Sequence, residues 1–272
     1  MIEQLAKNLV SLKKEFAKNY DGKSQMQEII PLSTSDSFPI KQQDLDLLHQ
    51  FATKNPIYYN SYEQTFDDTK CIVYEGDINK YWLNSIQHGS SNAPFSPTWI
   101  MSAYVAALMT KELGYSEVID IGSGDGRIAF CSKVLDMEAY SVELDEQLVE
   151  LQKILVTTLD FNPFCSDATT FDYTSLNLNH PVFFIGGLAQ MGGIALATGV
   201  IDKIQSNDFW KNTGWVFAGT YSQKYAPDPK NEAGWGTLIE ENKLQKIQTI
   251  SLPTVWTFHE TDETPYIFAE SL

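Results

Sequence analysis

The sequence predicts an α/β protein with a doubly wound, mostly parallel sheet, helices on both faces, and an N-terminal helical and aromatic cap. Two observations predict this class. An apolar run at residues 118–121 ends at a glycine loop and passes into a helical pattern. Short apolar runs then alternate with helical patterns as far as residue 220. This alternation is typical of strand–helix–strand units with buried parallel strands. A chain of 272 residues with 43% hydrophobic side chains is long enough to bury a full core.

The elements predicted from residue 118 onward follow a regular order. Strands are expected at 118–121, 139–143, 163–166, 182–185 and 215–220, and helices at 127–135, at 146–157 and in an Ala/Gly/Ile-rich segment that ends near 204. The prolines and glycines of residues 221–236 indicate a loop-rich insertion. The last strand signals lie at 246–251, 255–259 and 266–269, with a hairpin turn at 261–264.

Residues 1–95 are expected to form a cap on a domain that spans residues 96–272. A first helix has apolar residues spaced by three and four, which predicts one buried face: Ile2, Leu5, Leu9, Leu12 and Phe16. Polar residues 23–41 predict a loop, 42–53 a second helix and 71–74 a short strand. The tyrosines of residues 57–95 belong either to the core or to the floor of a substrate cavity. Ser96 and Pro97 predict the start of a third helix, as N-cap and first helical residue.

The glycine loop after the first parallel strand carries the strongest functional signal. Gly122, Gly124 and Gly126 allow positive φ and have no Cβ atom, so the backbone can touch a ligand. Loop N–H groups at a helix N-terminus suit a carboxylate or a phosphate. Glu143 ends the next strand, where a carboxylate can accept both hydroxyls of a ribose. The glycine spacing differs from G-x-G-x-x-G and so disfavours NAD and FAD.

This loop, which opens with Asp120, resembles motif I of the class I (Rossmann-like) S-adenosylmethionine-dependent methyltransferases. Residues 142–145, Val-Glu-Leu-Asp, resemble their post-I motif. The resemblance covers residues 96–272 and implies a seven-stranded sheet whose last strand is antiparallel, with S-adenosyl-L-methionine as cofactor. It places the methionine part at the loop, the ribose at Glu143 and the adenine over Leu144. The implied cofactor-binding residues are Asp120, Gly122, Ser123, Gly124, Gly126, Glu143, Leu144, Asp167, Ala168 and Gly186.

Asp167 is open to two interpretations at this stage. In the family, the corresponding position after the third strand often holds a carboxylate that accepts the adenine amino group. An aspartate that caps a helix or a turn explains the residue equally well.

The loop after the fourth parallel strand, residues 186–193, should lie beside the reactive methyl group. It lacks the Asn/Asp-Pro-Pro-Tyr/Trp motif of DNA and glutamine-amide methyltransferases and the aspartate-rich motif of polyamine synthases, which disfavours these activities. Candidate acceptor contacts are His88, Gln190 and Tyr221, and no catalytic base is assigned. The helix entry at 92–98 resembles that of several protein-modifying members of the family. The expected acceptor is a small molecule or a protein side chain, methylated on nitrogen or oxygen.

Charge and cysteine content limit the partners. A net charge of −16 repels phosphate backbones, which makes nucleic acid an unlikely partner. It favours neutral or cationic partners, or serves solubility. Cys71, Cys131 and Cys165 have no metal-ligand spacing, so no metal is expected, and Cys131 and Cys165 are expected to be buried. The sequence has no apolar signal segment and no run of eighteen apolar residues, so we expect a cytoplasmic protein without a membrane span.

Two other functions remain open from the sequence. The first is a regulatory module that binds S-adenosylmethionine without turnover, because no base and no known fourth-loop motif are visible. The second is an NAD-type oxidoreductase, which the glycine spacing makes the weaker alternative.

Overall fold

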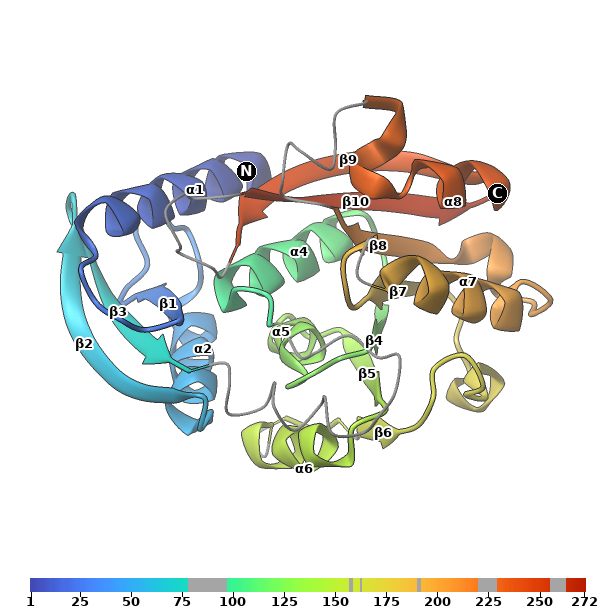
Figure 1. The fold of residues 1–272 in the computed structure, drawn as a ribbon, viewed down its shortest axis with the longest axis horizontal. Helices are drawn as coiled ribbons and strands as arrows, with labels where there is room; N and C mark the ends of the chain where they lie inside the picture. The colour runs from blue at the N-terminus through green and yellow to red at the C-terminus, as the bar shows by residue number, and fades with distance from the viewer. Residues whose placement is uncertain (78–96, 157–158, 162, 190–191, 220–228, 255–262) are drawn as a thin grey trace.

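A computed structural model of the chain describes residues 1–77, 97–156, 159–161, 163–189, 192–219, 229–254 and 263–272 (Figure 1). Its centre is a seven-stranded sheet in the order β6-β5-β4-β7-β8-β10-β9. The strands are β4 (Glu117–Ile121), β5 (Glu138–Glu143), β6 (Pro163–Cys165), β7 (Pro181–Ile185), β8 (Gly214–Ala218), β9 (Leu244–Pro253) and β10 (Glu263–Ser271). Strands β4 to β8 pair in parallel, and β10 is antiparallel to both β8 and β9. The predicted doubly wound, mostly parallel seven-stranded sheet is therefore confirmed.

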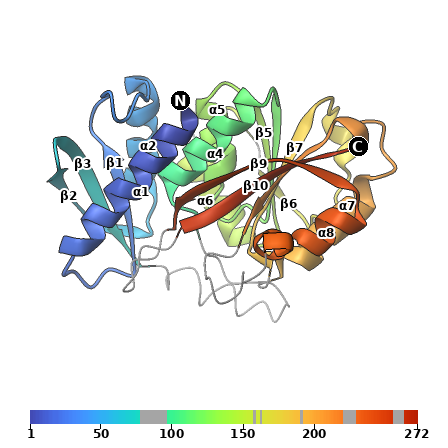
Figure 2. The ribbon, with the colours of Figure 1, turned by 90° about the horizontal axis from the view of Figure 1, so that it is seen from above.

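Helices cover both faces of this sheet (Figure 2). One face carries α4 (Ile100–Glu112), α5 (Arg127–Val134) and α6 (Glu146–Leu155), and the other carries α7 (Gly193–Ile204) and α8 (Gly236–Glu241). Side chains alternate between the two faces: Val118 belongs to the core under α4 and α5, whereas Ile119 and Ile121 belong to the core under α7. Short 3-10 helices, Tyr173–Leu176, Trp210–Asn212 and Pro229–Gly234, join some of these elements.

The N-terminal part contains strands as well as helices. A second sheet has the order β1-β3-β2, formed by β1 (Met26–Pro31), β3 (Thr69–Gly76) and β2 (Tyr58–Phe66), and all of its pairs are antiparallel. Helices α1 (Ile2–Asn19) and α2 (Gln42–Lys54) confirm the two predicted helices. The first packs on β9 and α4, and the second on β1, α5 and α6. The apolar face predicted for the first helix is buried: Ile2, Leu5, Leu9, Leu12 and Phe16.

Three predictions about local structure were wrong. Residues 23–41 are not all loop, because β1 forms there and is buried along its whole length. The cap is therefore not only helical and aromatic: it includes the three-stranded sheet. The third helix begins at Ile100 and not at Pro97: Trp99 has φ −58° and ψ 132°, which is not helical, the Thr98 carbonyl accepts from Arg127, and Ile100 N donates to Glu28. Cys165 is exposed, because it ends the short edge strand β6.

Some predictions fall outside the described residues. These are the strand at 255–259, most of the turn at 261–264 and residues 221–228 of the insertion. The proposed boundary at residue 95 also lies there. Across the described ranges, no helix combines the length and the hydrophobicity needed to cross a membrane.

Candidate functional site

The glycine loop lies at the carboxyl end of β4, the central strand of the parallel part of the sheet. Gly122, Gly124 and Gly126 have φ values of 63°, 57° and 76°, a region that L side chains rarely adopt. Two backbone bonds fix the turn: Gly122 N donates to Val142 O at 2.9 Å, and Gly126 N donates to Ser123 O at 2.8 Å. The loop then enters α5 directly, so its N–H groups lie at a helix N-terminus.

The carboxylate of Glu143, at the end of β5, binds the same loop. Its Oε2 accepts from Gly124 N at 2.8 Å, and its Oε1 accepts from Leu144 N at 2.8 Å and from Asp145 N at 3.0 Å. Burial raises the pKa of this carboxyl above its usual value, and the N–H groups of Asp145, Gly124 and Leu144 oppose that rise. The glycine loop and the acid of the next strand, predicted as partners in one site, lie in direct contact.

Gln152 of α6 supports the loop from below, and the sequence analysis missed it. Its Nε2 donates to Ser123 Oγ at 2.9 Å and to Gly124 O at 2.7 Å, while its Oε1 accepts from Ser141 Oγ. A Cβ atom on Gly126 would lie 2.9 Å from the Gln152 side chain. Its place in the sequence could have indicated this role, because Gln152 is a polar residue in the buried stripe that includes Leu148 and Leu155.

Asp120 lies beneath the loop and points toward α5. It is buried on the face of the sheet that α4 and α5 cover, because it alternates with Ile119 and Ile121, which face the other way. Its Oδ2 accepts from Ala129 N at 3.2 Å. Burial raises the pKa of its carboxyl well above the usual value. In this position Asp120 links β4, the strand before the loop, to α5, the helix after it.

The ends of β5 and β6 lie side by side, since Ser166 N donates to Glu143 O at 2.9 Å. Leu144 is 49% exposed, a large apolar side chain left open beside Glu143. The Oδ1 atom of Asp167 accepts from Thr169 N at 2.8 Å and from Thr169 Oγ1 at 2.7 Å, which is the geometry of a turn cap. Ala168 is buried, and its carbonyl accepts from the Tyr173 hydroxyl.

Gly186 allows β7 to end against the glycine loop. Its N–H donates to Ile121 O at 2.6 Å. A Cβ atom at this position would lie 2.4 Å from Gly122 O and 2.5 Å from Ile121 O. Both obstacles are backbone atoms, so only glycine fits without moving a strand end.

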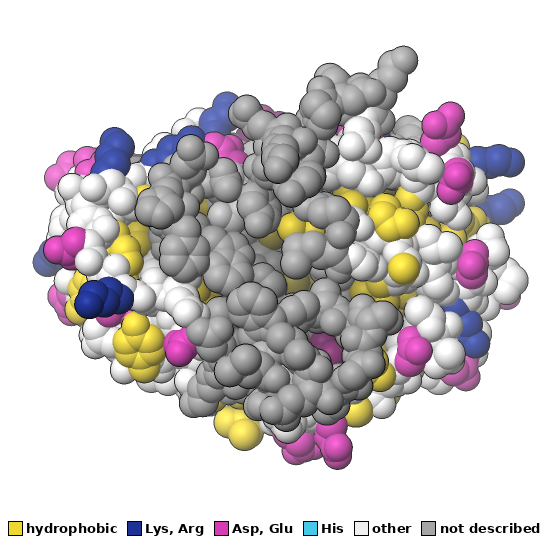
Figure 3. Space-filling view, in the orientation of Figure 1, with side chains coloured by type: hydrophobic (Ala, Val, Ile, Leu, Met, Phe, Trp, Pro, Cys, Tyr) yellow, Lys and Arg dark blue, Asp and Glu magenta, His cyan; other side chains and the backbone are white. Residues whose placement is uncertain are grey.

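The proposed acceptor contacts His88, Gln190 and Tyr221 lie outside the described residues. Within the described ranges no group of three or more His, Cys, Asp and Glu side chains is placed to hold a metal ion. Acidic side chains are spread around the visible face in Figure 3 and do not gather in one patch there.

The sheet order, the antiparallel β10 and the glycine loop after β4 together match the seven-stranded arrangement that the sequence resemblance implied. No family model matches the sequence, and no curated protein matches it.

Several solved structures share part of the fold. The glycopeptide N-methyltransferase MtfA, complexed with S-adenosyl-L-methionine, is 10% identical over 62% of this chain and 94% of its own, with a TM-score of 0.46. The ribosomal protein L11 methylase of Lactobacillus delbrueckii subsp. bulgaricus is 14% identical over 63% of this chain and 80% of its own, with a TM-score of 0.41. TYW2 of Pyrococcus horikoshii, in complex with MeSAdo, is 12% identical over 77% of this chain and 70% of its own, with a TM-score of 0.44. These likenesses concern the fold alone.

Proposed function

We propose that the protein is an S-adenosylmethionine-dependent methyltransferase that acts on a small-molecule or protein side-chain acceptor. One observation carries the proposal: the left-handed glycine loop at the end of β4 meets the Glu143 carboxylate at the end of β5. In an open parallel sheet, ligands bind beyond these strand ends. A glycine loop lets a ligand approach the backbone closely, and a neighbouring acid supplies acceptors for ribose hydroxyls.

The residues present fit this cofactor. Gly122 and Gly124 offer backbone without side chains, Glu143 offers two carboxylate oxygens, and the exposed Leu144 offers an apolar surface for a flat adenine. When bound, S-adenosylmethionine supplies an activated methyl group on a sulfonium. The protein's contribution is to hold that group in line with an acceptor atom, and positioning of this kind supplies most of the rate acceleration.

The net charge of the chain is the observation that bears on the acceptor. A net charge of −16 favours a neutral or cationic acceptor over a polyanion. His88, Gln190 and Tyr221 remain the proposed acceptor contacts. Methylation of nitrogen or oxygen follows from this choice, because both atoms occur in neutral and cationic acceptors.

Isothermal titration calorimetry with S-adenosylmethionine, S-adenosylhomocysteine and NAD tests the cofactor assignment. We expect the first two to bind and NAD not to bind. Turnover on a panel of metabolites and peptides then separates an enzyme from a module that only binds the cofactor. Tight binding of NAD without binding of S-adenosylhomocysteine would overturn the proposal.

The variant Gly124→Val tests the loop itself. A β-branched side chain at φ 57° strains the turn that brings Gly124 N to Glu143, so binding of S-adenosylhomocysteine should be lost. Gly114→Val is the matched control, because Gly114 has φ 92° with open space around it and lies at the far end of α4. The control should lose stability and keep its affinity. A folded Gly124→Val protein with unchanged affinity contradicts the loop assignment.

A further inference from the structure

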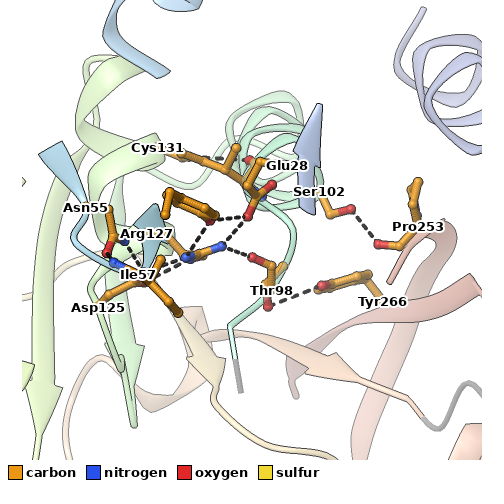
Figure 4. A network of polar contacts seen from close by, with 12 residues as sticks. Glu28, Asn55, Ile57, Thr98, Ser102, Asp125, Arg127, Cys131, Pro253 and Tyr266 are labelled. Carbon is orange, nitrogen blue, oxygen red and sulfur yellow. Dashed lines mark hydrogen bonds and ion pairs between the residues drawn. The ribbon is translucent and has the colours of Figure 1, made fainter. Parts of the chain in front are cut away.

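Arg127, the first residue of α5, lies at the centre of a buried polar cluster directly behind the glycine loop (Figure 4). Its Nε donates to Asp125 Oδ1 at 2.9 Å, and its Nη2 donates to Asp125 Oδ2, which makes the pair bidentate. Asp125 is itself a loop residue, between Gly124 and Gly126. Bidentate arginine–carboxylate pairs are the most directional of the charged hydrogen bonds. The conformation of the loop is therefore tied to the position of one guanidinium group.

That guanidinium is in turn held by the N-terminal cap. Arg127 Nη1 donates to Glu28 Oε1 of β1 at 2.7 Å, and Glu28 is completely buried. The Tyr58 hydroxyl of β2 donates to the same Glu28 oxygen at 2.7 Å. A separate contact comes from Asn55, at the end of α2, whose Nδ2 donates to Asp125 Oδ2 at 2.9 Å. The end of one cap helix thus contacts the loop itself, and two cap strands contact the arginine that holds the loop.

The cluster also fixes the chain that enters α4. Glu28 Oε2 accepts from Ile100 N, the first N–H of that helix, at 2.8 Å. Arg127 Nη1 donates to Thr98 O. The cap strand β1, the glycine loop and the start of α4 therefore meet at one carboxylate and one guanidinium.

Charge balance explains how such a cluster survives burial. Arg127 and Lys13 are the cations, Glu28 and Asp125 are the carboxylates, and each is at most 2% exposed. Burial opposes the charge of Arg127, but Asp125, with Tyr58 and Glu28, outweighs it and raises the arginine pKa well above its usual value. Removing one member of such a group leaves a buried charge without its partner, which is costly.

We propose that Glu28 and Tyr58, although they belong to the cap, are positioning residues for cofactor binding: they hold Arg127, and through it Asp125 and the glycine loop. The inference rests on the proposed function, since it concerns the loop assigned to S-adenosylmethionine. Neither side chain needs to touch the cofactor. The cap thereby affects the affinity for S-adenosylmethionine, although the proposed binding site lies at the ends of β4 and β5.

The cap offers a matched control for each residue. Tyr20 donates to Glu75 Oε1 at 2.7 Å, as Tyr58 does to Glu28, and both tyrosines are half-buried. Glu75 is bound by Tyr20 and Asn60, and neither of these residues belongs to the glycine loop. Tyr58→Phe is therefore compared with Tyr20→Phe, and Glu28→Gln with Glu75→Gln. Each pair removes the same chemical group, and all four residues belong to the cap.

The experiment measures the Kd of S-adenosylhomocysteine by calorimetry, stability by urea unfolding, and hydrogen exchange of the peptide that covers residues 122–130. Tyr58→Phe and Glu28→Gln should weaken binding roughly two- to thirtyfold, with Glu28→Gln the larger, and both should speed exchange in that peptide. Tyr20→Phe and Glu75→Gln should change neither, whatever they do to stability.

Wild-type affinity and exchange in a folded Tyr58→Phe protein would overturn the inference, as would equal effects in the control variants. If Glu28→Gln does not fold, Tyr58→Phe, which loses only one hydroxyl, still decides. A wild-type protein that does not bind S-adenosylhomocysteine at all would instead refute the proposed function, so the two failures are distinguishable.

Discussion

At the scale of single residues, Glu143 has a structural role in addition to the ribose contact predicted from the sequence. Its carboxylate accepts from the backbone of Gly124, Leu144 and Asp145. It therefore stabilises the glycine loop in addition to its proposed contact with ribose. Any change at this position affects the shape of the site as well as its chemistry.

We expect Glu143→Gln to weaken S-adenosylhomocysteine binding by about ten- to a hundredfold, because hydrogen bonds to a charged acceptor contribute about 1.5–3 kcal/mol. The amide also turns a donor toward backbone N–H groups that need an acceptor. Calorimetry at pH 7 measures the effect. Asp172→Asn is the control, since Asp172 is an exposed turn cap that accepts from Thr174 N. Equal affinities for wild type and Glu143→Gln would show that the carboxylate has no part in binding.

Lys13 is a second informative residue, because a buried ammonium is rare. It lies 5.7 Å from the Phe16 ring centroid and 5.5 Å from that of Trp99. Burial lowers the pKa of Lys13 from 10.5 to about 8, against the attraction of Glu28. The unfolded chain keeps its proton up to about pH 10.5, so it binds more protons than the folded protein between those values, and stability should rise with pH there.

The variant Lys13→Met lacks this titration. The free energy of unfolding of wild type relative to Lys13→Met should therefore increase from pH 8 toward pH 10.5, by about 3 kcal/mol in all. Urea unfolding of both proteins at several pH values measures the difference, in which the other titrating groups cancel. A difference that stays flat, or that falls as pH rises, would mean that Lys13 is not held in a low-dielectric site.

At the scale of elements, the structure depends on how closely strand ends approach one another. The end of β7 meets the glycine loop backbone to backbone at Gly186. Such contacts position the loop more firmly than side chains can, because a strand end has no rotamers.

Gly186→Ala should lower stability by about 1–3 kcal/mol, the usual cost of overpacking, and should weaken cofactor binding. The added methyl group would lie 2.4 Å from Gly122 O, and neither strand can yield without moving the site. Gly199→Ala is the contrasting variant: it lies within α7, and the atoms nearest its added methyl group belong to the Thr169 side chain and not to the backbone of a strand end. Thermal unfolding and calorimetry of both variants test the difference, and a neutral Gly186→Ala would count against it.

How much of each element the sequence could predict follows from its local run of apolar residues: β1 is buried along its whole length, but Gln27 and Glu28 interrupt its apolar run, and it went unpredicted. Strands such as β4 and β7 are buried on both faces and mostly apolar, so local composition reveals them. The strand β2 is mostly exposed and polar, so it has no such pattern and went unpredicted. The cap contacts were equally hidden, because Glu28 meets Arg127 across 99 positions and Asn55 meets Asp125 across 70. Long-range polar pairing has no local signature in one sequence.

At the scale of the whole molecule, the N-terminal part and the sheet share one hydrophobic core. Buried residues of α1, α2, β1 and β3 belong to the same cluster as those of α4, α5 and one face of the central sheet. We propose that residues 1–95 fold with residues 96–272 as one cooperative unit and act as a cap over the acceptor.

Deleting residues 1–77 should therefore abolish cooperative folding, since it uncovers α4 and leaves Arg127 and Asp125 without Glu28 and Asn55. Size-exclusion chromatography, circular dichroism and urea unfolding of the truncated chain test this. A truncated protein that stays monodisperse, unfolds cooperatively and binds S-adenosylhomocysteine normally would show that the cap is a separate domain.

The neutral cluster behind the loop also constrains how the sequence can diverge. A chain that loses Glu28 alone keeps a buried Arg127 with one partner fewer, whereas a chain that replaces both by apolar residues loses no charge balance. Positions 28 and 127 should therefore change together in related sequences, and position 125 should follow them. Substitutions at these positions should therefore occur in pairs and be rare. The exposed acidic residues around the molecule can be substituted one at a time.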